Sequence, residues 1–92
     1  FKGGVDVYDG NMNLLFSDNQ AGISKTNASG WHLGAYSGTS GRLYLYSQGS
    51  DGTFSKKEVK AASPMFSILP LKPYTQPVAA VCNGLKLTVY EY

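Results

Sequence analysis

The chain has 92 residues, of which eight are basic and six acidic, and its formal net charge is +2. This length supports a single domain with one thin core, which buries roughly 64% of the extended-chain surface. A single cysteine excludes an internal disulfide and a zinc site made of several cysteines. The charge is too small to indicate a nucleic-acid partner, and no apolar run reaches the length of a membrane-spanning helix.

Turn-forming residues are abundant, with 11 glycines and four prolines among them. The apolar residues occur in short alternating runs between glycine-rich segments, which is typical of strands and hairpins. We therefore expect residues 1–92 to form one all-β domain. The expected architecture is a small antiparallel β-sandwich or barrel built from three hairpins, with a proline-rich extended arm.

The first predicted hairpin joins Val5–Tyr8 to Leu14–Phe16 across the turn Asp9–Asn13. A two-residue loop and a four-residue loop are both compatible with this turn, and they give registers of the same parity. Either loop therefore places the same apolar side chains on the buried face: Val5, Val7, Leu14 and Phe16.

The turn Asp9–Asn13 also looks like the opening of a calcium-binding loop. That loop needs glycine at its sixth position and glutamate at its twelfth, where this chain has Leu14 and Gln20. We interpret the segment as a plain β-turn that needs no metal.

The next segment, Ser17–Gly30, is predicted to be a long loop or to hold a short polar strand.

A middle hairpin then joins Trp31–Ser37 to Arg42–Ser47 through the loop Gly38–Gly41. Neither face of this hairpin is polar, which predicts a strand pair that is covered on both sides. One face carries Trp31, Leu33, Ala35, Tyr44 and Tyr46, and the other carries His32, Tyr36, Leu43 and Leu45.

The segment Ser55–Ser63 has too few apolar residues for an amphipathic helix, so a short helical turn, a loop and a polar strand all remain open. Its three lysines are interpreted as a solvated face: Lys56, Lys57 and Lys60.

Residues 63–77 contain all four prolines. Proline lacks the backbone donor that a central strand needs, so this segment is confined to an edge or to an extended arm. Met65–Leu69 is a possible strand, and Leu71–Gln76 resembles an extended linker. The apolar side chains here need cover, either from a neighbouring subunit or from the segment folding back over its own domain. We favour the neighbouring subunit, with these interface candidates: Met65, Phe66, Ile68, Leu69 and Tyr74.

The last predicted hairpin joins Val78–Cys82 to Leu85–Tyr92 through Asn83-Gly84, the preferred pair for a type I′ turn. This turn pairs Cys82 with Leu85 and predicts a buried thiol that is chemically inert. The predicted buried face carries Val78, Ala80, Cys82, Leu85, Leu87 and Val89.

Few residues indicate chemistry. His32 is the only histidine, and we interpret it as a strand histidine rather than a catalytic one. The aromatic residues Trp31, Tyr44 and Tyr46 could form a platform that stacks on sugars, but the same rings are also needed to fill the core. No catalytic motif is present in the sequence, so we expect no catalytic residues, no metal site and no cofactor.

The segment Gly4–Asp18 resembles the opening of small proteins encoded beside the tail-tip and tail-fibre genes of long-tailed bacteriophages. Those proteins begin with a G-hydrophobic-x-V-aromatic strand, an acidic or Asn-Gly turn, and a hydrophobic-Phe-Asp/Ser strand. The resemblance covers about fifteen of the 92 residues, and Met12-Asn13 is an insertion relative to that pattern. The matching pairs, in order, are Gly4-Val5, Val7-Tyr8, Asp9-Gly10 and Leu15-Phe16.

This resemblance implies a non-enzymatic structural component of a phage virion, associated with the tail tip or a tail fibre and made in the host cytoplasm. The implied partners are other copies of the chain, other virion proteins and a host-surface glycan or receptor, with no nucleic acid and no membrane insertion. The alternative is a carbohydrate-binding, lectin-like module that uses Trp31 and the nearby tyrosines. A ring or multi-copy particle would favour the first interpretation, and an isolated monomer with an aromatic cleft the second.

Overall fold

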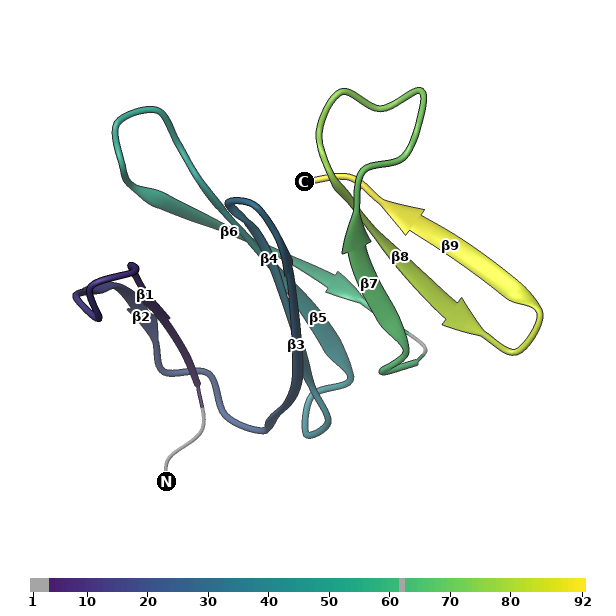
Figure 1. The fold of residues 1–92 in the computed structure, drawn as a ribbon. Helices are drawn as coiled ribbons and strands as arrows, with labels where there is room; N and C mark the ends of the chain where they lie inside the picture. The colour runs from purple at the N-terminus through teal and green to yellow at the C-terminus, as the bar shows by residue number, and fades with distance from the viewer. Residues whose placement is uncertain (1–3, 62) are drawn as a thin grey trace.

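The computed structural model describes residues 4–61 and 63–92, and these form nine strands in three antiparallel sheets (Figure 1). The predicted all-β antiparallel class is confirmed. Within this part of the chain, no helix has the length and apolarity needed to cross a membrane. The strands are β1 (Val5–Tyr8), β2 (Leu14–Asp18), β3 (Ile23–Ser29), β4 (His32–Ser37), β5 (Arg42–Gln48), β6 (Phe54–Lys60), β7 (Phe66–Leu69), β8 (Val78–Asn83) and β9 (Lys86–Tyr90).

The sheets stack as three layers around a central sheet of order β3-β4-β5-β6. In Figure 1 the purple hairpin β1-β2 lies on one side of this sheet, and the green-to-yellow sheet β7-β8-β9 lies on the other. Each interface has its own core. One core contains Leu43, Leu45, Ala61, Phe66, Ile68, Ala79 and Val81, and the other contains Val5, Ala35, Tyr44 and Tyr46.

The middle hairpin has the predicted register and the predicted faces. Ala35 pairs with Tyr44 across β4 and β5, and the loop Gly38–Gly41 connects the two strands. Because side chains alternate along β5, Leu43 and Leu45 enter one core while Tyr44 and Tyr46 enter the other. The strand pair is therefore covered on both sides, as its apolar pattern predicted.

The two segments with open alternatives are both polar strands. Ser17–Gly30 contains β3, and Ser55–Ser63 contains most of β6. These strands form the two edges of the central sheet. An edge strand buries fewer side chains than a central one, which explains how a polar sequence can form it.

The first hairpin differs from the prediction in register. Val7 pairs with Phe16, and both side chains are half-buried, but a bulge between Val7 and Tyr8 shifts the pairing, and Leu14 becomes exposed. The turn causes this shift. The Asp9 carboxylate accepts the N–H groups of Asn11 at 2.8 Å and Asn13 at 2.9 Å, which closes a five-residue loop between paired Tyr8 and Leu14.

The register and inner face predicted for the last hairpin are wrong. Asn83 pairs with Lys86, so Gly84 and Leu85 form the turn. Gly84 has a φ of 64° and Asn83 is not among the residues of positive φ, as in a type II′ turn, whose first central residue is glycine. The inner face of β8 carries Ala79 and Val81. The face that carries Ala80, Cys82 and Leu87 points outward, and Cys82 is half-buried.

The proline-rich segment folds back on its own domain. It contains β7, an edge strand of the three-stranded sheet, and a loop in which the Tyr74 N–H donates to the Leu71 carbonyl at 2.9 Å. The prediction that Phe66 and Ile68 lie at a subunit interface is therefore wrong, because these side chains are 4% and 5% exposed in the core of their own chain. Leu71–Gln76 forms a turn rather than an extended linker.

Candidate interaction surfaces

The three aromatic residues proposed as a sugar platform do not form one. Tyr44 and Tyr46 are 3% and 0% exposed, so their ring faces cannot stack on a ligand, whereas Trp31 is 55% exposed in the turn between β3 and β4. Burial and then a hydrogen bond to Asp18 raise the pKa of Tyr46. The two tyrosines fill the core between the hairpin and the central sheet.

A polar cluster joins this core to solvent at the β2–β6 side. The Lys56 ammonium lies 2.8 Å from Asp18 Oδ2 and 4.7 Å from the Tyr44 ring centroid, and the Tyr46 hydroxyl donates to Asp18 Oδ2 at 2.6 Å. Burial acts to raise the pKa of Asp18, but the hydrogen bonds from Lys56 and Tyr46 outweigh it and lower that pKa. Lys56, Lys57 and Lys60 are exposed, as predicted for a solvated face, and Lys56 also joins β6 to β2 through its ion pair with Asp18.

The single histidine, His32, contacts residues that are distant in the sequence. His32 Nε2 lies 3.3 Å from Gln76 Oε1, and its ring meets Tyr92 edge-on at 4.7 Å between centroids. The Tyr92 hydroxyl in turn donates to the Leu33 carbonyl at 2.6 Å, and burial raises the pKa of Tyr92. His32 therefore joins β4 to the β7–β8 loop and to the chain end. Across the described residues, no group of three or more His, Cys, Asp or Glu side chains is arranged to hold a metal ion.

A more informative feature is the side of the sheet β7-β8-β9 that faces away from the core, here called the outer face. It is almost entirely apolar, it includes a hollow of about 390 Å³, and it is bordered by Met65 and Leu87, which are 61% and 62% exposed. Alternation along the three strands places these residues on it: Ser67, Leu69, Val78, Ala80, Cys82, Leu87 and Val89, of which Val78 is only 1% exposed.

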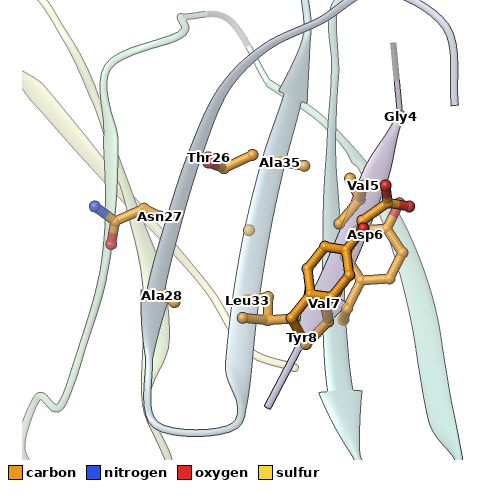
Figure 2. A pocket seen from close by; sticks show the side chains of 12 residues that line it. Gly4, Val5, Asp6, Val7, Tyr8, Thr26, Asn27, Ala28, Leu33 and Ala35 are labelled. Atoms are coloured by element: carbon orange, nitrogen blue, oxygen red, sulfur yellow. The ribbon is translucent and has the colours of Figure 1, made fainter. Parts of the chain in front are cut away.

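The second feature is a groove on the opposite side of the molecule, here called the β1 groove (Figure 2). It has a volume of about 540 Å³, with β1 as its wall and β3 and β4 as its floor. The hairpin β1-β2 has two strands and the central sheet has four, so part of the central sheet is left uncovered. The floor is lined by small or apolar side chains: Thr26, Ala28, Leu33 and Ala35.

The predicted interface residues that are not in the core lie at two different places on the surface. Met65 and Leu69 line the hollow on the outer face, whereas Tyr74 lines a separate small pocket of about 100 Å³ near Tyr92. The sequence prediction missed Ala80, Cys82 and Leu87 as surface residues, because it assigned that face to the core. A signal was available, since residues 78–82 are apolar at every position and alternation alone could not choose the buried face.

Comparison with known proteins gives no relative: no family model, no curated protein and no solved structure matches this chain.

Proposed function

We propose that this chain is a non-enzymatic structural component of a bacteriophage virion, associated with the tail tip or a tail fibre, that acts through subunit–subunit contacts. The observation that carries the proposal is the outer face. Met65 and Leu87 are mostly exposed on it, and the hollow between them is lined largely by apolar side chains. A contiguous apolar patch on a small domain is typical of a protein contact site.

The viral part of the proposal depends on the resemblance of residues 4–18 to small phage tail proteins. These residues form the hairpin β1-β2 together with its turn, so the resemblance covers one complete layer of the fold. The carbohydrate-binding alternative is less well supported, because Tyr44 and Tyr46 are buried, which leaves Trp31 as the exposed ring among the three candidate residues.

Mass spectrometry of intact particles, purified from a culture that produces the chain, tests the proposal. We expect the chain at a constant ratio to the other particle proteins. Detection only in the soluble fraction, with none in purified particles, would overturn the virion assignment.

The outer face is tested in the same preparation. A Met65→Ser, Leu87→Ser double variant should be lost from particles while its thermal unfolding stays close to that of the parent, because both side chains are exposed. Leu15→Ser on β2 is the matched control, since Leu15 is also an exposed leucine but lies on a different layer. Equal incorporation of the double variant and the control would exclude the outer face as the contact.

A further inference from the structure

We propose that the outer face of one copy docks in the β1 groove of a second copy, so that copies join head to tail. This inference rests on the proposed function, because it identifies the partner of the outer face as the chain itself. Three observations support it: the open strand edges, the shapes of the two surfaces and their charges.

The first observation concerns strand edges. β1 pairs only with β2, and β9 pairs only with β8, so each presents one open edge in the described structure. Other edges approach each other within the molecule. Asn27 Oδ1 on β3 accepts the Ile68 N–H of β7 at 2.9 Å, and Asp18 on β2 pairs with Lys56 on β6 at 2.8 Å. Open edges add strands readily, so β1 and β9 are suited to pair between copies.

Such pairing determines which face enters the groove. If β9 of one copy extends the sheet of β1 in another, one side of the incoming sheet must lie over the exposed floor of β3 and β4. The inner side, with Ala79 and Val81, is already packed on its own central sheet. The outer face is therefore the one that enters the groove.

The second observation concerns shape. The groove floor carries the small side chains of Thr26, Ala28 and Ala35, whereas the outer face carries Leu87 and Val89. Small side chains opposite large ones allow two sheets to approach to the usual separation of about 10 Å. A single contact would then cover both the exposed leucine and the open groove.

The third observation concerns charge, and it selects the occupant. Residues 4–20 contain three aspartates and no lysine or arginine, and of these Asp18 is paired with Lys56. Lys25 lines the hollow on the outer face, whereas Asp6 of the hairpin lines the β1 groove. Two outer faces placed together would bring the positive charges of two Lys25 side chains toward each other, whereas the acidic hairpin beside the β1 groove offers Lys25 an opposite charge. The contact is therefore heterologous, which produces rings or filaments.

The test uses two variants that each disable one surface. Ala28→Glu places a charge on the groove floor, and Leu87→Glu places one on the outer face; both positions are exposed, so folding should be retained. We expect the parent chain to form oligomers by light scattering and each variant alone to have the monomer mass of 9.9 kDa. An equimolar mixture should form a one-to-one dimer, because one intact groove and one intact outer face remain.

Thiol labelling gives an independent readout, since Cys82 is the only cysteine and lies on the outer face. In the mixture, about half of the thiols should be protected, namely those of the Ala28→Glu copies, whose outer face is occupied. Ser50→Glu, in the exposed loop between β5 and β6, is the control and should oligomerise like the parent chain.

Two results would overturn the inference. Dimers of Ala28→Glu alone, with monomeric Leu87→Glu, would mean that two outer faces pair with each other. A parent chain that stays monomeric at high concentration would mean that copies do not join; if the chain is nevertheless found in particles, the outer face binds a different virion protein and the proposed function stands. If either variant fails to fold by circular dichroism, Thr26→Glu and Met65→Glu replace them at the same two surfaces.

Discussion

On one side of the central sheet, β7-β8-β9 builds a continuous and mainly aliphatic core, whereas on the other side the hairpin β1-β2 covers only part of the sheet. The aliphatic side buries Leu43, Leu45 and Ile68 among others. The core on the hairpin side is filled mainly by Tyr44 and Tyr46, whose hydroxyls have polar partners, and the β1 groove beside it is open. The number of strands in the covering layer therefore decides the outcome on each side. Three strands produce a closed core, whereas two strands leave a surface that can receive a partner.

The largest expected effect tests this difference directly. Leu45→Ala should reduce the free energy of unfolding by about 3 kcal/mol, because it leaves a cavity in the closed core. Val7→Ala, on the half-buried side of the hairpin, should cost only about 1 kcal/mol, since nearby solvent and groove space relieve the loss. Urea unfolding at one fixed protein concentration measures both values. Equal losses would mean that the two sides are equally well packed.

A smaller loss of stability is expected at the contact between β3 and β7, which closes the edge of the aliphatic core. Asn27→Ala removes the acceptor of the Ile68 N–H and should cost about 1–2 kcal/mol, because that partly buried donor loses its partner. Asn27→Asp keeps an oxygen at the same place and should restore most of the stability. If Asn27→Ala unfolds at the same urea concentration as the parent, the hydrogen bond does not help to hold β3 against β7.

The same comparison explains which parts of the structure could be predicted from the sequence. The middle hairpin was predictable in register, because a loop with glycine at both ends connects two strands that are apolar on both faces. The last hairpin was not, since Gly84 can serve either as the second residue of a type I′ turn or as the first of a type II′ turn. The second possibility occurs, and it moves the pairing of Cys82 from Leu85 to Leu87.

The candidate surfaces were harder to predict than the strands. Phe66 and Met65 are neighbours of similar hydrophobicity, yet one is buried and the other exposed, because β7 alternates against a core contributed by distant strands. The β1 groove arises from the mismatch between a two-stranded and a four-stranded layer. No local pattern encodes this mismatch, because it depends on where the hairpin lies on the sheet.

The polar cluster of Asp18, Lys56 and Tyr46 predicts that the stability of the fold depends on pH. The pKa of Asp18 is lowered in the folded state, so its ionised form stabilises the fold above the unfolded pKa of about 3.9. That contribution is lost as the pH falls from about 4 through the lower folded pKa. Asp18→Asn should remove this part of the acid sensitivity, at a cost of about 1 kcal/mol or less at neutral pH. Thermal unfolding from pH 7 to pH 2 measures it, and an unchanged acid profile in the variant would contradict the role of the polar cluster.

The smallest expected effect lies at the tip of the same hairpin and has the opposite sign. Met12 has a φ of 66°, a left-handed conformation that costs a residue with a Cβ roughly 1–2 kcal/mol. Its side chain is exposed, so replacing it removes little packing. Met12→Gly relieves this strain but increases the conformational entropy of the unfolded chain, which leaves a net stabilisation of about 0.5–1 kcal/mol. Met12→Asn is the matched comparison, because asparagine tolerates the left-handed region and keeps a side chain. A higher urea midpoint for both variants is expected, and a lower midpoint for both would show that Met12 contributes a contact that outweighs the backbone strain.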